Sequence, residues 1–480
     1  MDASGDRWCV VRKWPWQQRS DWLRRKAASA PIGVALESGP GFGDLGRWSL
    51  FAWEPEAVFS VRGGEWELHN ERWPTITKLP AHLSPLEAFR RLIAQTRYSL
   101  DADEIGLPFR GGWIGFVGYD FSPQLERLPR RHRPSSLPDM YWMYFPWAHL
   151  IDRRQGTHFL VSDGRFDDDL WPRRLDEMQA KGPILSSPES VATLPAPAMN
   201  PPRSDWSKDE YSAAVSRTIE YIRAGDIFQA NLTHRFSTTL HSTWRGPERI
   251  RDLWERCTNQ SPAPFSALIK TPNWSVLSTS PERFLLLEPD GRVETRPIKG
   301  TRPRGKTANE DLAQMTELLA SAKDRAELAM IVDLERNDLG RVCRFGSVRV
   351  AQHAALESYS NVHHLVSVVE GKLKGGCDVV GLLAATFPGG SITGAPKIRA
   401  MEIIDELEAV SRGVYTGAIG YISDHGRADF NIAIRTLVVE GDRAHFHVGG
   451  GITADSDPDA EYEETLAKGS KLTQVLCGDS

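Results

Sequence analysis

The chain has 480 residues, of which 40% are hydrophobic and 25% are charged, and a formal net charge of -5. This is ordinary globular composition, and the chain is long enough to bury a large interior. The slightly acidic balance and the lack of a long run of Lys and Arg argue against a nucleic-acid-binding protein. We therefore expect no nucleic acid partner.

The cysteines and the apolar segments indicate where the protein resides. The chain has five scattered cysteines, and none forms a Cys-x-x-Cys pair of the kind that zinc sites use. Residues 1–25 lack the apolar core of a signal peptide, and no stretch approaches the ~20 apolar residues of a membrane span. We expect a cytoplasmic protein with no membrane association.

The pattern of the first part of the chain predicts short strands. Segments 33–38 and 48–53 alternate in polarity between Gly-rich turns, and only 85–96 has a clear helical pattern. Between Ser186 and Ser204 the sequence turns into Ser, Pro, Ala and Asn, which is typical of a linker. The expected domains are a strand-rich region, 1–190, and a second region, 205–480.

The second region begins with a helix. Ser207 and Glu210 form a capping-box pattern, and apolar residues follow at helical spacing until Gly225. Strand runs then come in hairpin-like pairs, without regular alternation of strand and helix, which predicts an α+β fold with mainly antiparallel sheet. Longer helices are expected at about 310–335, 395–410 and 458–476.

Lys299 is the most unusual residue of the second region. It lies in Thr295–Pro303, between Pro297-Ile298 and Gly300, where a stiff apolar setting can desolvate the amine. Desolvation lowers the pKa of a lysine and frees its lone pair for nucleophilic attack. The alternative is a structural lysine on a strand.

Two acidic helix segments form a second cluster. Asp324 and Glu327, like Glu461 and Glu464, are three residues apart and hence share one helical face. If both faces meet, four like charges converge, and Mg2+ is the cation that suits carboxylates and an anionic substrate. The alternative is two solvated helix faces.

Two glycine-rich segments could approach a ligand closely. Segment 387–397 runs through a Gly-rich turn into a helix with Pro396 near its start, and helix N-termini bind anions. It is not a Walker A loop, so nucleotide phosphate is a poor candidate. Three glycines, Gly449–Gly451, precede the second acidic helix. An ordinary helix cap is the alternative for the first segment.

These segments, in this order, resemble the chorismate-utilising enzymes, the family of anthranilate, aminodeoxychorismate, isochorismate and salicylate synthases. The similarity spans the chain and is strongest from Trp206 onward. It implies two mainly antiparallel sheets packed as a sandwich with peripheral helices. In this family lysine in the Pro-Ile-Lys-Gly-Thr motif is typical of aminodeoxychorismate synthases, and alanine is typical of anthranilate synthases.

The resemblance also implies residue roles. Lys299 would be the nucleophile, Glu282 the general acid that protonates the departing C4 hydroxyl, and His364 would position the ring. Glu327 and Glu464 match the magnesium ligands, and Asp324 and Glu461 match acidic positions that contact the metal through water. Lys397 lies near the expected substrate shell, whose members are Ser391, Thr393, Gly394, Tyr415, Arg435, Gly449 and Gly450.

Gln229 bears on the choice of reaction. In the isochorismate and salicylate branches the residue aligned with it is typically a lysine that activates water, and glutamine cannot act as that base. The resemblance therefore implies amination of chorismate to 4-amino-4-deoxychorismate. Ammonia would come from a separate glutamine amidotransferase, because the chain lacks a Gly-x-Cys-x-Gly nucleophile setting. The alternatives are anthranilate synthase component I and a non-catalytic amino-acid-binding relative.

The strand-rich region carries one further candidate site. Leu36–Ser38 and Arg47–Ser49 resemble the part of the family that binds tryptophan, with Glu37, Ser38 and Trp48 as candidate contacts. The alternative is plain strand core.

Overall fold

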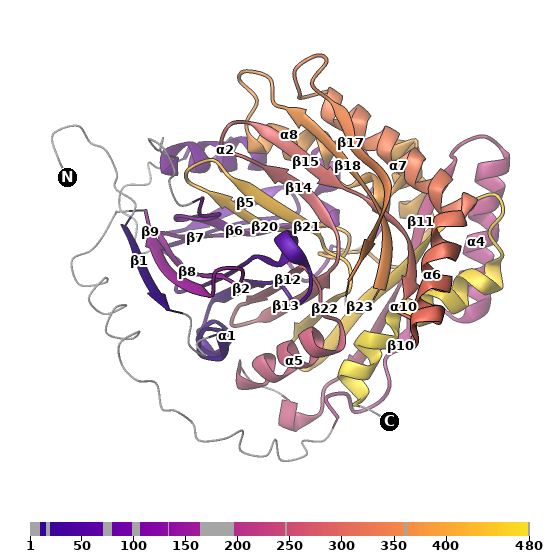
Figure 1. Ribbon diagram of the computed structural model, residues 1–480, viewed down its shortest axis with the longest axis horizontal. Coiled ribbons are helices and arrows are strands. Elements are labelled where there is room, and N and C mark those ends of the chain that lie inside the picture. Colours follow the sequence, from indigo (N-terminus) through magenta and orange to yellow (C-terminus); the bar gives the residue numbers. More distant parts are fainter. Residues whose placement is uncertain are drawn as a thin grey trace.

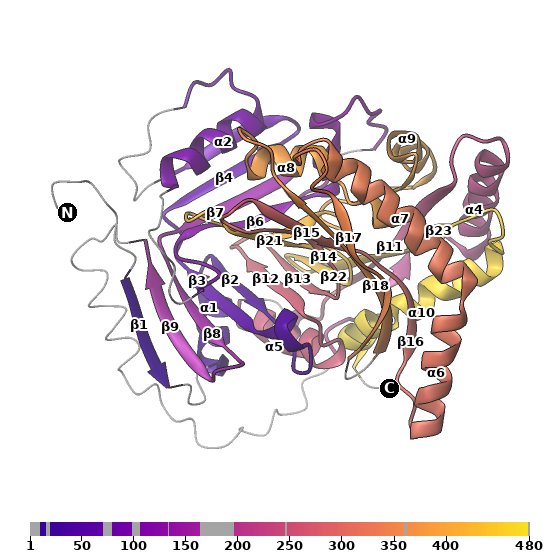
Figure 2. The same cartoon turned by 45° about the horizontal axis from the view of Figure 1, so that its top comes forward.

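The architecture is a sandwich of two large sheets with helices outside. The computed structural model describes residues 10–15, 20–70, 79–97, 106–132, 134–163, 196–244, 247–359 and 362–478. Every strand pairing within the two sheets is antiparallel, and the helices surround the sheets in Figures 1 and 2. This confirms the expected α+β class with two mainly antiparallel sheets.

The first sheet combines strands from both parts of the chain. Its centre is the pairing of β2 (Gly33–Glu37) with β12 (Phe265–Lys270), in which Leu36 faces Ala267. β19 (Gly394–Ala395) pairs with β11 at one side. In spatial order the sheet contains β1 (Val10–Pro15), β9 (Thr157–Ser162), β8 (Trp147–Asp152), β3 (Trp48–Trp53), β2, β12, β13 (Trp274–Ser280), β22 (Thr436–Glu440), β23 (Arg443–Ile452), β11 (Gln229–Thr239) and β10 (Arg203–Ser204).

The second sheet is built in the same mixed way. Here β6 (Gly112–Val117) pairs with β20 (Ala418–Ser423), so both sheets join strands from the two sides of segment 186–204. β17 (Arg349–Ser358) pairs with β18 outside the main path. The order is β16 (Ile298–Pro303), β18 (Val362–Lys372), β15 (Arg292–Arg296), β14 (Arg283–Leu287), β21 (Ala428–Ile432), β20, β6, β7 (Met140–Phe145), β4 (Ala57–Arg62) and β5 (Glu65–His69).

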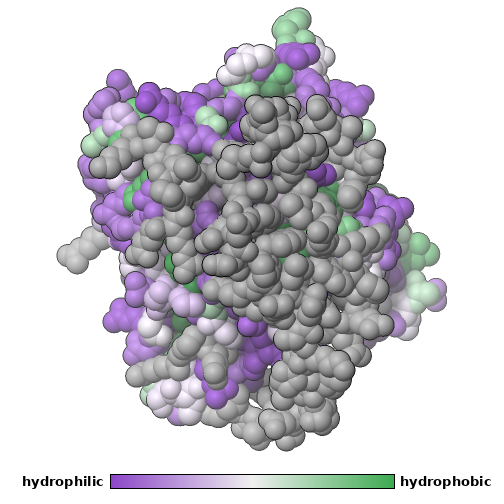
Figure 3. Space-filling view, turned by 90° about the vertical axis from the view of Figure 1, so that its left-hand side faces the viewer, coloured by the Kyte–Doolittle hydropathy of each residue, from purple (hydrophilic) through white to green (hydrophobic). Residues whose placement is uncertain are grey.

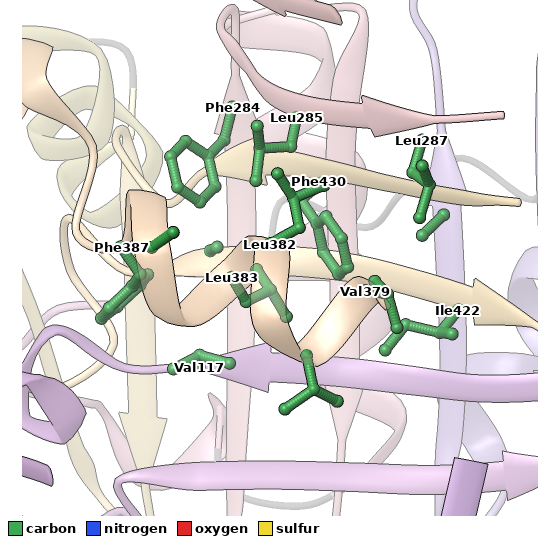
Figure 4. Close-up of a cluster of buried hydrophobic side chains, with 14 of the residues drawn as sticks. Val117, Phe284, Leu285, Leu287, Val379, Leu382, Leu383, Phe387, Ile422 and Phe430 are labelled. Carbon is green, nitrogen blue, oxygen red and sulfur yellow. The ribbon is translucent and has the colours of Figure 1, made fainter. Parts of the chain in front are cut away.

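Three apolar layers hold the sandwich together. The layer between the sheets includes Val34 and Ile269 from the first sheet and Ile114 and Ile419 from the second, all buried. The outer face of the first sheet packs against α1 (Ser20–Ser29), α5 (Pro247–Gln260) and α10 (Pro458–Cys477). The second sheet packs against α2 (Pro85–Thr96), α7 (Ala322–Gly340) and α8 (Val379–Thr386), and Figure 4 shows the α8 side chains against β14 and β21.

The described residues form further helices. They are α4 (Lys208–Arg223), α6 (Ala308–Ala320), α9 (Lys397–Leu407) and the short 3-10 segments η1 (Gly43–Gly46), η2 (Tyr119–Gln124), η3 (Ser242–Trp244) and η4 (Gly390–Ile392). The capping box of Ser207 and Glu210 is present at the start of α4, as expected.

Two helix expectations need correction. The expected helix at 310–335 is two helices, because Ser321 adopts an extended backbone and its hydroxyl accepts from the Asp324 backbone N–H at 3.2 Å, which starts α7 afresh. Helix α1 was not expected from the sequence pattern. Segment 186–195 of the expected linker lies outside the described residues.

Figure 3 shows hydrophilic residues over much of the described surface on one side, with hydrophobic patches between them. Within the described ranges, no helix combines the length and the apolar character that a membrane span requires.

Candidate active site

Lys299 on β16 is the centre of the candidate site. Its Nζ lies 3.5 Å from the backbone oxygen of Ser391 in η4. Burial lowers the pKa of Lys299, and the charge of Lys468 acts in the same direction, whereas Glu327 and Glu282 oppose the shift. The amine is thus held closer to its neutral, nucleophilic form than a surface lysine is.

Glu282, between β13 and β14, supplies a carboxyl group beside this amine. Its side chain is buried, and burial raises its pKa to about 7. The Ser391 hydroxyl, the Lys299 charge and the Ile298 backbone N–H act in the opposite direction. Near neutral pH a large fraction of Glu282 is therefore a carboxylic acid and can donate a proton.

Among the buried polar atoms that have no hydrogen-bond partner within the described residues, Oε1 of Glu282 and Oε1 of Gln229 lie at this site. Gln229 and Lys299 flank Gly451, since a Cβ there would lie 2.0 Å from Gln229 Nε2 and 3.7 Å from Lys299 Nζ. Buried polar groups normally have partners, so this group is suited to receive a polar ligand.

His364 and Arg435 approach the site from β18 and from the turn before β22. His364 Nδ1 lies 2.8 Å from Thr301 Oγ1, and burial, with the charge of Arg435, lowers the pKa of His364 to about 4. Arg435 has φ 51°, and its backbone oxygen accepts from the Thr279 N–H at 3.0 Å. Its guanidinium makes no ion pair or hydrogen bond with any described residue, so it is available to an anion.

Tyr415 lies in the turn that precedes β20. Its ring stacks on His447 with 5.2 Å between ring centroids and 15° between planes. Burial raises the pKa of Tyr415, so its hydroxyl stays protonated. Nearby, Arg412 Nη2 pairs with Glu408 at 2.6 Å and fixes the turn.

The two hydroxyl side chains of the Gly-rich turn, Ser391 and Thr393, have different surroundings. The Ser391 hydroxyl lies beside the carboxyl of Glu282, whereas Thr393 Oγ1 donates to the Gly389 oxygen at 2.9 Å. Gly394 has φ 153°, and a Cβ there would lie 2.1 Å from the Gln229 oxygen, so the residue allows β19 to pair with β11.

Lys397 has a structural contact. Its Nζ donates to Asp338 Oδ2 at 2.5 Å and to the Thr386 oxygen at 2.9 Å. These bonds tie α9 to α7 and to the end of α8, and they occupy the amine.

Glycines on β23 bring two elements close. A Cβ on Gly449 would lie 2.4 Å from the Leu232 oxygen, and one on Gly450 would lie 2.9 Å from Glu461 Oε2. The glycines therefore let the start of α10 approach the strand that carries the site.

The two acidic helix segments do face each other. Burial raises the pKa of Glu327 on α7, and the charges of Asp324 and of Glu461 on α10 add to this shift. Glu464 is also partly desolvated, but its ion pair with Lys468 at 2.7 Å and the charge of Lys299 lower its pKa overall. The charges of Glu327 and Glu464 thus both act on the amine of Lys299.

The partners of the four carboxylates bear on whether they could hold Mg2+. Asp324 pairs with Arg302 at 3.4 Å, and Glu461 accepts from Ser456 Oγ at 2.6 Å, so both already have partners. Among the described residues no three His, Cys, Asp or Glu side chains are grouped as a metal site. Glu464 is paired with Lys468 at 2.7 Å, so of the four carboxylates only Glu327 has no hydrogen bond or ion pair with a described residue. One such carboxylate is within the one or two that hold Mg2+ beside an anionic substrate.

The candidate tryptophan contacts border a cavity of about 110 Å³ between the sheets. The carboxylate of Glu37 accepts from Arg24 Nε at 2.9 Å and from Trp254 Nε1 at 3.0 Å. The Ser38 hydroxyl donates to the Pro264 oxygen at 2.5 Å. Two of the three side chains are thus satisfied by the protein, and Trp48 lines the cavity.

Glu335 is among the buried carboxyls that the sequence pattern did not identify. Glu335 on α7 is 7% exposed and accepts from Thr295 Oγ1 at 3.0 Å. It shares the buried face of the helix with Leu328, Ile331 and Leu339. A carboxylate at an apolar-spaced position of a helix was the signal that could have identified it.

Comparison with known proteins gives one consistent family. Residues 36–474 match the model of the chorismate binding enzymes. The chain is 35% identical to aminodeoxychorismate synthase component 1 of Bacillus subtilis, over 97% of this chain and 96% of that protein. It is 41% identical to an anthranilate synthase component 1 of Haloarcula marismortui, over 77% of this chain and 76% of that protein.

Solved structures agree with this result. The crystal structure of anthranilate synthase component I from Streptococcus pneumoniae superimposes with a TM-score of 0.73 at 30% identity, covering 89% of this chain and 92% of that one. The Escherichia coli isochorismate synthase MenF, at 15% identity and a TM-score of 0.68, shares the fold. By the extent of these matches, the chain belongs to the family of chorismate binding enzymes.

Proposed function

We propose that the chain is component I of an aminodeoxychorismate synthase, which converts chorismate and ammonia to 4-amino-4-deoxychorismate. The observation that carries this proposal is the juxtaposition of Lys299 and Glu282. The pKa of the amine is lowered and the pKa of the carboxyl is raised to about 7, so each is poised for its role in covalent displacement.

The reaction would proceed in two displacements. Lys299 Nζ forms a bond to C2 of chorismate, the ring double bonds shift, and the C4 hydroxyl leaves as water with the proton of Glu282. Ammonia then forms a bond to C4, the bond from C2 to the lysine breaks, and the incoming nitrogen returns a proton to Glu282. Covalent catalysis divides one difficult step into two easier ones.

The neighbouring residues would hold and orient the substrate. The unpaired guanidinium of Arg435 and the hydroxyl of Tyr415 suit a carboxylate, and the neutral ring of His364 would position the chorismate ring. Gln229, at the side of Lys299, can donate and accept hydrogen bonds but cannot activate water as a base. This composition favours an amine nucleophile over water.

The carboxylates of α7 and α10 would hold Mg2+. Glu327 and Glu464 would be its protein ligands, with Asp324 and Glu461 in contact through water. When bound, the ion would neutralise a carboxylate of the substrate.

The ammonia source would be a separate glutamine amidotransferase. Component naming of the relatives supports a partner, and the chain's cysteines lack a Gly-x-Cys-x-Gly setting. The product would serve 4-aminobenzoate and folate biosynthesis in the cytoplasm, with aromatisation by another protein.

The small cavity beside Trp48 would bind tryptophan as a feedback inhibitor or a structural ligand. A tryptophan titration should raise the melting temperature of the wild type and not of Trp48→Ala. No shift in the wild type would remove this ligand.

Anthranilate synthase is the second candidate, because a relative with that name is 41% identical over 77% of the chain. Mass-spectrometric product analysis with chorismate, Mg2+ and ammonium, with and without an aminodeoxychorismate lyase, separates the two. Lyase-dependent 4-aminobenzoate supports the proposal. Anthranilate formed without lyase contradicts it, as does the absence of any product when a glutamine amidotransferase partner is also supplied.

A further inference from the structure

A cavity of about 820 Å³ opens at one edge of the sandwich, where β23, β11 and β10 end the first sheet. These strands supply one wall, and segments 134–136 and 409–413 contribute to the other. Lys299, Glu282 and Arg435 do not line this cavity, so it is separate from the candidate active site.

The strand register places polar side chains on the inner face of the sheet here. Arg203 pairs with Ser237, and Ser237 pairs with His445, so the three side chains lie in one row on the same face. Val438, the partner of His445 on β22, belongs to the apolar layer between the sheets. The inner face therefore changes from apolar to polar at this edge, and the space beside it is suited to a polar ligand.

Positive charge predominates in the cavity. Its described lining residues include four arginines and one carboxylate: Arg203, Arg235, Arg412, Arg443 and Glu440. Arg235 pairs with Asp205 at 2.9 Å, outside the lining. Arg412 pairs with Glu408 at 2.6 Å. Glu440 lies 3.9 Å from His445 Nδ1, so the remaining two guanidiniums leave the cavity with a net positive charge.

Arg203 and Arg443 are the two unneutralised arginines. Both are exposed, and neither makes an ion pair or hydrogen bond with a described residue. They lie on β10 and β23 with β11 between them, so their backbones are about 10 Å apart. A guanidinium holds a carboxylate or phosphate by two parallel N–H bonds. This spacing favours an anion with two separated acidic groups over a single small ion.

His447 adds a buried polar group at the inner wall. It lies two residues along β23 from His445, hence on the same inner face, and it is 4% exposed. Its ring stacks on Tyr415 and makes no hydrogen bond within the described part of the chain. Burial, with the charge of Arg235, lowers the pKa of His447 well below its ordinary value, so the neutral ring offers one donor and one acceptor. Buried polar groups normally have partners, so a molecule in the cavity must satisfy this ring.

We propose that this cavity is a second ligand site, which binds a small organic anion with two separated carboxylate or phosphate groups. Arg203 and Arg443 each hold one acidic group at the rim, and the ring of His447 bonds a polar atom of the ligand at the inner wall. The site goes beyond the proposed amination, because its residues are not those that would hold chorismate.

Isothermal titration calorimetry of the full chain with citrate, at constant ionic strength and without Mg2+, tests the site. Citrate should bind at one site, and more tightly than inorganic phosphate, which cannot reach both guanidiniums. Arg203→Gln and Arg443→Gln should each weaken citrate binding by about tenfold or more, because each removes a charge-assisted pair. His447→Phe, which keeps a ring against Tyr415 but has no ring nitrogen, should also weaken it.

Two variants serve as controls. Arg223→Gln removes an equally exposed charge at the end of α4, outside the cavity lining, and should leave citrate binding unchanged. Arg435→Gln should also leave it unchanged, because this arginine belongs to the candidate active site. If His447→Phe does not fold, the two variants at the rim suffice, since their side chains are exposed.

Four results overturn the inference: no citrate binding, wild-type affinity in any of the three cavity variants, equal affinity for citrate and phosphate, or a loss confined to Arg435→Gln. The last would place citrate at the candidate active site. None of these measurements involves turnover, so the product analysis described above tests the proposed function separately.

Discussion

At the scale of single residues, burial decides the chemistry of the site. The same desolvation lowers the pKa of Lys299 and raises that of Glu282, because each loses the water that stabilises its charged form. Their mutual attraction opposes both shifts. The pair therefore moves toward a neutral amine beside a neutral acid, which is what nucleophilic attack with acid-assisted departure needs.

The raised pKa of Glu282 makes stability depend on pH. Folding raises this pKa from 4.5 to about 7, so the contribution to stability is complete below pH 4.5 and is lost as pH rises through 7. The difference in free energy of unfolding between Glu282→Gln and the wild type should therefore favour the variant by about 3 kcal/mol more at pH 8 than at pH 4.5. Urea unfolding at both pH values measures this difference.

The control for this change is Glu317→Gln on α6, an exposed side chain that pairs with Arg302. Its effect on unfolding should be small at both pH values. An equal stability change for Glu282→Gln at the two pH values would contradict the assigned burial effect.

The sequence indicated which residues could carry the chemistry, but it did not indicate which partners their side chains contact. The stiff motif around Lys299 identified the amine correctly as a desolvated group. Lys397 was expected near the substrate shell and Glu37 at the tryptophan site, yet their partners are Asp338 and Arg24, on other elements. Which neighbour a charge finds depends on contacts between distant segments, and local spacing contains no information on them.

At the scale of elements, close approach of backbones shapes the site. Glycines on β23 allow Gln229 of β11 and the start of α10 to approach, and Gly394 allows its own strand, β19, to pair with β11. The Gly-rich segments predicted that a ligand would approach the backbone closely. In the structure, the groups that approach these glycines belong mainly to other segments of the protein.

Gly451→Ala tests this arrangement. A Cβ there would lie 2.0 Å from Gln229 Nε2, so the amide beside Lys299 must shift, and kcat/KM should fall at least about tenfold while the melting temperature changes by no more than a few degrees. Steady-state kinetics and thermal unfolding measure the two effects. Gly375→Ala, with no atom within 4 Å of its Cβ, should be neutral in both. Full activity of Gly451→Ala would show that Gln229 has no role at the amine.

At the scale of the whole molecule, each of the two sheets contains strands from both sides of segment 186–204. β2 needs β12, and β6 needs β20, to satisfy their backbone groups. Hairpin periodicity predicted antiparallel strands, and the family resemblance implied the sandwich. The pairing of strands more than 200 residues apart has no local signal, so the sequence alone could not predict it.

This interleaving predicts a single cooperative unfolding transition. Tryptophans are buried on both sides of segment 186–204, among them Trp113 and Trp254, so fluorescence reports on both. Thermal unfolding followed by fluorescence and by far-UV circular dichroism should give coincident midpoints. Two transitions more than about 5 °C apart would indicate that the regions 1–190 and 205–480 unfold independently.

The most direct test of the account is the intact mass of the protein after incubation with chorismate and Mg2+ without ammonium. The wild type should gain the mass of chorismate less one water, with the modification located on Lys299, and should lose it when ammonium is added. Lys299→Arg, which keeps the charge, should gain nothing. An unmodified wild type together with undiminished ammonia-dependent turnover in Lys299→Ala would contradict covalent catalysis by this lysine.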